Sequence, residues 1–163
     1  MSSRGCGFVQ SLYFYPIKSC GSIISHSLDL HTDLGVYGDR SVALVHPETH
    51  VVLTQREYPT LATVCGDPQL IDTRGTLMLS VILDGRLTRV EMPFRRFNDD
   101  KREFKLHKDV ASGYFLGSSS IFERLLGFKP MVVILDEKNP RIHASSSLGK
   151  DIPLGFADGY PVL

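Results

Sequence analysis

The 163-residue sequence has no excess of charge of either sign and no apolar run long enough to cross a bilayer. Its 18 basic and 18 acidic side chains cancel, so no whole-protein field draws it toward nucleic acid or anionic lipid. A membrane-spanning helix needs about 20 consecutive, mostly apolar residues. We therefore expect no nucleic-acid partner and no membrane partner, and any bound anion must be held by a local site.

Cysteine is also scarce, and its spacing argues against two further classes of protein. The three cysteines, Cys6, Cys20 and Cys65, form an odd count without a C-x-x-C pair, which disfavours a disulfide framework and a structural zinc site. The segment Met1–Gly7 lacks the apolar core of a signal peptide and the arginine pattern of a transit peptide. We therefore expect a reducing compartment and predict the cytoplasm.

What the sequence does have is strand-like patterning along most of its length. Aromatic and β-branched residues on both parities of Gly7–Pro16 predict a strand buried on both faces, whereas Ser22–Leu30 alternates around Ile24, His26 and Leu28. Further strands are predicted at Ser41–His46, Val51–Thr54, Leu61–Cys65, Thr76–Leu83, Arg86–Met92, Arg102–His107 and Met131–Leu135.

Turn residues separate these strands and mark two hairpins. Asp84–Gly85 stands between two apolar runs, which is the strongest short-range hairpin pattern, and Pro47–His50 is a four-residue hairpin loop. Gly66–Pro68 predicts a turn, and the polar stretch Asp136–Lys150 predicts a long, mobile loop. Strands spaced at about 8 to 12 residues with turns between them predict a barrel or a sandwich.

One segment has the apolar spacing of a helix. In Ser119–Leu126, apolar residues recur at i, i+1, i+4 and i+5 from Ile121, serines precede them as N-caps, and Gly127 follows at the position of a C-terminal cap. The predicted fold class is therefore mainly β, with one short α-helix.

Four stretches occur in a fixed order along the chain: Tyr15–Gly21 (YPIKSCG), Gly38–Val45 (GDRSVALV), Leu53–Leu61 (LTQREYPTL) and Phe156–Leu163 (FADGYPVL). They resemble the MOSC family, whose members include the C-terminal region of molybdenum cofactor sulfurase and the mitochondrial amidoxime-reducing component. The resemblance implies a β-barrel-like MOSC N-terminal domain over residues 1–155 and the start of a truncated MOSC domain over 156–163. Where family members have aspartate–cysteine–glycine, this chain has Ala111–Gly113.

The resemblance also implies a cofactor. In the family, molybdopterin lies between this domain and the MOSC domain, and a lysine, a serine and an arginine from this half hold its phosphate and pterin. Carried over, these residues are Lys18, Ser19 and Arg40, whose donors suit a phosphate. The cysteine that ligates molybdenum has no counterpart here. The resemblance thus implies a chain that is inactive alone, that needs a MOSC domain in cis or in trans, and that meets a redox partner protein. It also associates the chain with pyridoxal phosphate binding, oxidoreductase activity and sulfur transfer.

Other interpretations stay open. Lys18 and Arg40 could be solvated surface charges, and the chain could be a stand-alone interaction or carrier module without cofactor. Cys20 could be a nucleophile beside Lys18, although a packed thiol is the commoner case. Arg95–Arg96, flanked by phenylalanines, could stack on nucleotides, although a loop cluster is favoured at zero net charge. The six histidines are scattered, so we predict no metal site.

Overall fold

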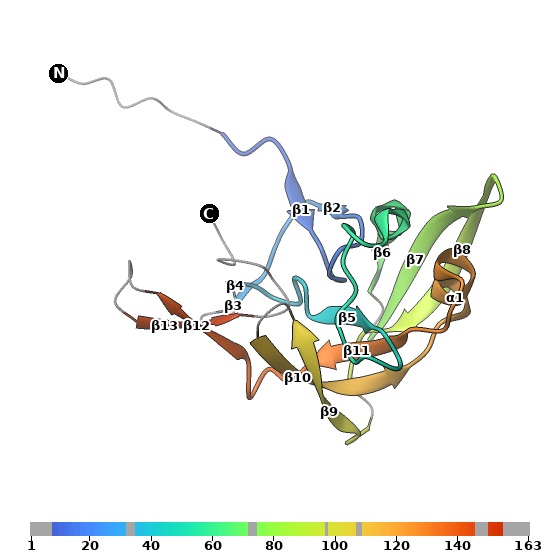
Figure 1. Ribbon diagram of the computed structural model, residues 1–163. Helices are drawn as coiled ribbons and strands as arrows, with labels where there is room; N and C mark the ends of the chain where they lie inside the picture. The colour runs from blue at the N-terminus through green and yellow to red at the C-terminus, as the bar shows by residue number, and fades with distance from the viewer. Residues whose placement is uncertain are drawn as a thin grey trace.

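The computed structural model describes residues 8–31, 35–71, 75–96, 98–106, 109–145 and 150–154. Strands dominate this part of the chain, together with one α-helix and one 3-10 helix (Figure 1). The strands are β1 (Leu12–Phe14), β2 (Ile23–Ser25), β3 (Leu30–His31), β4 (Gly35–Val36), β5 (Val42–Val45), β6 (Cys65–Ile71), β7 (Thr76–Leu83), β8 (Arg86–Pro93), β9 (Lys101–Leu106), β10 (Asp109–Gly117), β11 (Met131–Leu135), β12 (Arg141–Ser145) and β13 (Lys150–Leu154). The predicted mainly β fold class is confirmed. Among the described residues, no helix is long and apolar enough to cross a membrane.

Antiparallel pairing organises these strands into sheets. The largest sheet has four strands in the order β5-β11-β10-β9, and the next has three in the order β6-β7-β8. The pairs β1-β2, β3-β4 and β12-β13 form two-stranded sheets. Figure 1 shows the β7–β8 and β12–β13 hairpins at opposite ends of the molecule. A parallel bridge from Ile17 to Val42 joins the loop after β1 to β5, and this bridge matters for the site described below.

β5 is buried on both faces and separates two core clusters. Val42 and Leu44 face the larger cluster, which contains residues of β7 and of the α-helix. Ala43 and Val45 face the smaller cluster, formed with β9, β10 and β11. All four side chains are at most 1% exposed, so the sequence VALV reads as a continuous apolar run rather than an alternation. A strand held on both sides fixes the turn that precedes it.

The helix α1 (Ser120–Leu126) packs against the larger cluster. Ile121 and Phe122 are buried in it, as the apolar spacing predicts. Gly127 ends the helix at φ +78, a left-handed conformation that glycine adopts without steric cost. On the exposed side, Arg124 forms a 2.9 Å ion pair with Asp84 at the tip of the β7–β8 hairpin. The predicted helix is confirmed.

Both predicted hairpins are also confirmed. Asp84 and Gly85 connect β7 to β8 with φ values of +51 and +72, the pair of positive φ angles that favours Asp-Gly in tight hairpins. At the loop 47–50, Val45 pairs with Val52 in antiparallel fashion across the turn, but only as an isolated bridge, so the predicted strand Val51–Thr54 does not form.

Two predictions in the segment after this hairpin are wrong. Instead of a strand at Leu61–Cys65, a 3-10 helix, η1, occupies Pro59–Thr63. Proline is favoured at the start of a helix, because the N–H groups of the first turn have no partner within the helix and the N–H that proline lacks is therefore not missed. Instead of a turn at Gly66–Pro68, the strand β6 runs through these residues. Gly66 is explained by packing, since an added Cβ would lie 2.4 Å from Cδ1 of Ile23.

The N-terminal strands are less buried than the sequence predicts. β1 spans only three residues and Phe8 is 90% exposed, so Gly7–Pro16 is not a strand buried on both faces. In β2 the buried residue is Ile23, whereas Ile24 is 60% exposed, so the alternation around Ile24 does not mark the buried face. A two-stranded sheet that packs one face against the core leaves the other face uncovered.

Two further differences lie toward the C-terminus. Asp136–Lys150 is not one long loop, because β12 forms within it and pairs with β13. The nine-residue β10 was not predicted, since its Ser112–Gly113 pair has the composition of a turn. An added Cβ at Gly113 would lie 2.4 Å from the backbone oxygen of Ile134, so glycine here permits close approach to the neighbouring strand. The predicted start of a MOSC domain, residues 156–163, lies outside the described residues.

Candidate functional site

The loop after β1 places Lys18 and Ser19 at the start of β5. Ile17 is 1% exposed and anchors the loop in the core. The Lys18 N–H donates to the carbonyl oxygen of Val42 at 2.8 Å, and the Cys20 N–H closes a tight turn on Ile17 at 3.2 Å. Ser19 is the third residue of that turn and has φ +67, which an L-residue with a side chain rarely adopts.

A second tight turn, immediately before β5, places Arg40. The Ser41 N–H donates to the carbonyl oxygen of Gly38 at 3.2 Å, and Arg40 is again the third residue, with φ +47. The Arg40 N–H donates to the carbonyl oxygen of Tyr15 at 2.6 Å, which ties this turn to the first one. Gly38 has φ +76 and packs so closely that an added Cβ would lie 3.3 Å from the Phe94 ring. Ser19 and Arg40 therefore occupy equivalent strained positions in two linked turns.

These turns form one wall of a pocket of about 250 Å³. Tyr15, Lys18–Cys20 and Arg40 line it from one side, and Thr54–Arg56 line it from another. The three residues carried over from the family motifs, Lys18, Ser19 and Arg40, are thus brought together by the fold. Thr54–Arg56 belongs to the family-like stretch Leu53–Leu61 but was not predicted to be part of the site. Its charged and amide side chains on a turn before a proline were the available signal.

Asp39 holds the arginine of the pocket in place. Its carboxylate accepts the Tyr15 N–H at 2.8 Å and an Arg40 Nη1 donor at 2.7 Å. The Arg40 guanidinium also lies over the Tyr15 ring, 4.9 Å from its centroid. Burial raises the pKa of Asp39 above its ordinary value, and the opposing effects of the Tyr15 N–H and Arg40 do not cancel that increase. Part of the Arg40 charge is therefore committed within the protein.

The remaining groups suit anion binding rather than nucleophilic catalysis. Lys18 is only 3% exposed, an uncommon state for a lysine and one that fixes its position. Cys20 is buried, and burial together with the nearby Cys65 raises the pKa of its thiol to about 12, so it is protonated at neutral pH. The structure thus supports a packed thiol. A lysine, an arginine and a serine hydroxyl at one pocket fit a phosphate group.

Metal binding has no comparable support in the described part of the chain. No group of three or more histidine, cysteine, aspartate or glutamate side chains that could hold a metal ion is present there. Cys20 and Cys65 are free thiols, one buried and one exposed.

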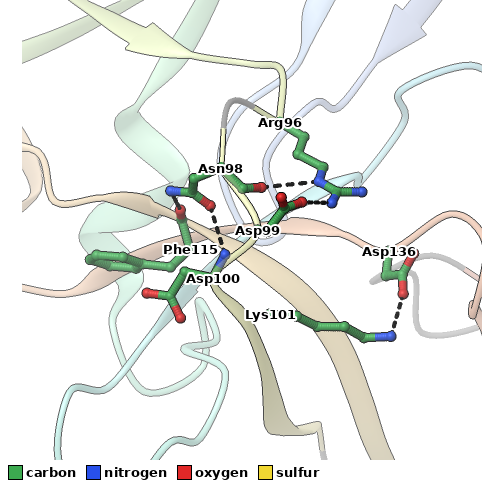
Figure 2. A network of polar contacts seen from close by, with 7 residues as sticks. All are labelled: Arg96, Asn98, Asp99, Asp100, Lys101, Phe115 and Asp136. Atoms are coloured by element: carbon green, nitrogen blue, oxygen red, sulfur yellow. Dashed lines mark hydrogen bonds and ion pairs between the residues drawn. The ribbon is translucent and has the colours of Figure 1, made fainter.

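The basic pair Arg95–Arg96 belongs to a different region, of which Figure 2 shows Arg96 and its partners. Arg96 pairs with Asp99, donates to the Asn98 backbone oxygen at 3.0 Å and lies over the Tyr114 ring, 3.8 Å from its centroid. Its charge and its aromatic partner are thus used inside the protein. For Arg96, the loop-cluster interpretation is supported over nucleotide stacking.

Arg95 and Arg96 also line a larger cavity of about 580 Å³. Its apolar lining comes from Phe14, Ile23, Leu28, Val36, Phe94 and Ile134. At its rim, the buried Asp136 forms a 2.6 Å ion pair with Lys101, also shown in Figure 2, and accepts a 2.8 Å hydrogen bond from Asn139. Burial alone would raise the pKa of Asp136, but the Lys101, Asn139 and Lys138 donors outweigh it and hold the pKa below its ordinary value.

Comparison with known proteins gives one match. The family model of the MOSC N-terminal beta barrel domain matches residues 6–128, well over half of the chain. No curated protein and no solved structure gives a significant match. The matched range contains both tight turns, Thr54–Arg56 and α1. The chain therefore belongs to the family of the MOSC N-terminal β-barrel domain.

Proposed function

We propose that this chain is the phosphate- and pterin-contacting half of a molybdenum-cofactor site, with Lys18, Ser19 and Arg40 as its cofactor-binding residues. The observation that supports this most is their convergence on one pocket of about 250 Å³, although Lys18 and Arg40 lie far apart in the sequence. A buried ammonium, a guanidinium and a hydroxyl supply phosphate donors from several directions.

The proposal requires a second domain. A MOSC domain, in cis or in trans, would supply the thiolate ligand to molybdenum, since the described residues offer no metal-binding cluster. When bound, the molybdenum centre would supply redox or sulfur-transfer chemistry. In the completed protein, this chain would bind and orient the phosphate and pterin end of the cofactor; alone, it is catalytically inert. Its free cysteines fit a reducing compartment such as the cytoplasm, where a redox partner protein would meet the completed site.

The test is cofactor analysis of the purified protein. The chain would be produced in a host that makes molybdopterin, once alone and once together with a MOSC domain from the same family. We expect pterin and molybdenum in stoichiometric amounts only in the complex. A complex that forms but carries neither would contradict the proposal.

A second candidate function is a stand-alone interaction or carrier module without cofactor. The observation in its favour is the uncovered face of the β1–β2 sheet, where Tyr13 and Ile24 pair across the strands and are 50% and 60% exposed. Exposed apolar residues that cluster often mark an interface. Capture of a partner protein by cofactor-free chain, with no pterin in any sample, would favour this function over the first.

A further inference from the structure

The loop Thr54–Tyr58 is held firmly at both ends and presents its tip to the pocket. Leu53, just before it, is 4% exposed, and its N–H donates to the carbonyl oxygen of Leu44 at 2.8 Å. The Tyr58 N–H donates to the carbonyl oxygen of Thr54 at 2.9 Å, and the Tyr58 ring packs edge-on against Phe128. The two residues at the tip, Gln55 and Arg56, are exposed and line the pocket.

The two arginines of the pocket differ in what they already bind. Arg40 is committed to Asp39 at 2.7 Å and to the Tyr15 ring. Arg56 makes no ion pair and no side-chain hydrogen bond with the part of the chain that the structure describes. The nearest acid in its own loop, Glu57, accepts a 3.2 Å hydrogen bond from the Thr54 hydroxyl and is not part of the pocket lining. The donors of Arg56 are therefore the uncommitted ones.

We infer that Arg56 is a fourth phosphate-binding residue, which closes the open side of the pocket over a phosphate monoester held by Lys18, Ser19 and Arg40. This inference rests on the proposed function. Both residues line the pocket, Lys18 as a buried cation and Arg56 as an exposed one, so we expect a phosphate held there to contact both. A guanidinium can donate two parallel hydrogen bonds to one phosphate, which a lysine cannot.

The experiment is a titration of the purified chain with inorganic phosphate, followed by the backbone amide resonances of Ser19, Arg40 and Arg56. Potassium chloride at equal ionic strength is the reference, because it screens charge without offering a phosphate. Arg56→Ala should weaken phosphate binding about tenfold, the loss typical of one charge-assisted hydrogen-bonded contact. The phosphate affinity of Arg56→Lys should lie between those of the wild type and Arg56→Ala, since lysine keeps the positive charge but lacks the planar guanidinium.

Arg86→Ala is the matched control. Arg86 is also an exposed arginine without a side-chain partner among the described residues, but it lies at the β7–β8 turn and does not line the pocket. It should leave phosphate affinity unchanged. The amide spectrum reports in the same experiment that each variant is folded.

The outcomes separate the inference from the proposed function. If Arg56→Ala binds phosphate with wild-type affinity while Arg40→Lys binds it more weakly, the proposed role of Arg56 is wrong and the proposed site still stands. Equal loss in Arg56→Ala and Arg86→Ala would show a general effect of net charge and would also overturn it. No phosphate-dependent shift in the wild-type chain, up to concentrations of tens of millimolar, would contradict both.

Discussion

The small pocket and the large cavity lie on two sides of the same turn and differ in how their charges are used. Arg40 of the Gly38–Ser41 turn lines the small pocket, whereas Gly38 and Ser41 line the large cavity. In the large cavity the buried carboxylate of Asp136 is neutralised by Lys101. In the small pocket Arg56 keeps a charge without a partner among the described residues.

The size of the two spaces alone therefore does not predict which of them would bind an anion. The large cavity holds about 580 Å³ and the small pocket about 250 Å³. Yet of the two, only the small pocket has backbone strain at non-glycine lining residues, Ser19 and Arg40, and it also contains the uncommitted Arg56. Such strain persists only where the surrounding structure enforces it, and it is common at ligand sites.

The largest expected effect is a loss of bound pterin that occurs on substitution in the small pocket but not in the large cavity. Lys18→Ala and Arg40→Ala, in protein completed by a MOSC domain, should each lower bound pterin about tenfold or more, because a charge-assisted hydrogen bond contributes roughly 1.5 to 3 kcal/mol. Ser27→Ala, in the wall of the large cavity, should leave bound pterin unchanged. The measurement is pterin content per protein. An equal loss in all three variants would remove the distinction between the two regions.

The next effect concerns the turn that both regions share. Gly38→Ala should destabilise the protein by about 1 to 2 kcal/mol, because alanine at positive φ is strained and its Cβ would press on Phe94. Gly85→Ala is the matched control, since Gly85 also has positive φ but no atom within 4 Å of an added Cβ. Urea denaturation measures both. A loss at Gly38 no larger than that at Gly85 would show that the ring contacts add nothing.

A smaller effect should separate stability from binding. Ser19→Gly relieves strain at φ +67 and should stabilise the fold by roughly 0.5 kcal/mol. The same change removes a hydroxyl donor and should weaken phosphate binding a few-fold, since a neutral hydrogen bond contributes about 0.5 to 1.5 kcal/mol. In Ser19→Gly the free energy of unfolding should therefore rise while the affinity for phosphate falls. If stability falls instead, the serine side chain contributes more to the fold than the strain costs.

The smallest effect is a contrast in pH dependence between Asp39 and Asp136. The pKa of Asp39 is raised by burial, so its contribution to stability falls as pH rises above the ordinary value of 3.8. The pKa of Asp136 is lowered by its donors, so its contribution is present above 3.8 and is lost as pH falls below that value. Stability curves of Asp39→Asn and Asp136→Asn against the wild type should therefore slope in opposite directions. If the stability difference from the wild type changes with pH in the same direction for both variants, the predicted contrast between Asp39 and Asp136 is wrong.

The sequence contained the residues of the site but not their conformations. The buried Ile17 and the apolar β5 explain why the loop after β1 meets the turn before β5, and the family-like motifs name Lys18 and Arg40. Positive φ at Ser19 and Arg40 could not be read from residue type, because neither is a glycine or an asparagine. The strands were easiest to predict where apolar runs were continuous, as in β5 and β11.

Other features depended on contacts between distant segments and had no local pattern. The large cavity is assembled from β1, β2, β10 and β11 together with loops, so no short motif marks it. β10 carries Gly113 because of a backbone neighbour in β11, and Gly66 in β6 because of Ile23 in β2. At Gly66 the sequence predicts a turn and at Gly113 it predicts no element, and in both places tertiary packing produces a strand.

The most direct test of the central claim is a structure of this chain in complex with a MOSC domain and molybdopterin. We expect the phosphate to lie in the small pocket, with its oxygens within hydrogen-bonding distance of Lys18, Ser19 and Arg40 (roughly 2.7 to 3.2 Å). A phosphate in the large cavity beside Arg95, with the small pocket holding only solvent, would contradict it.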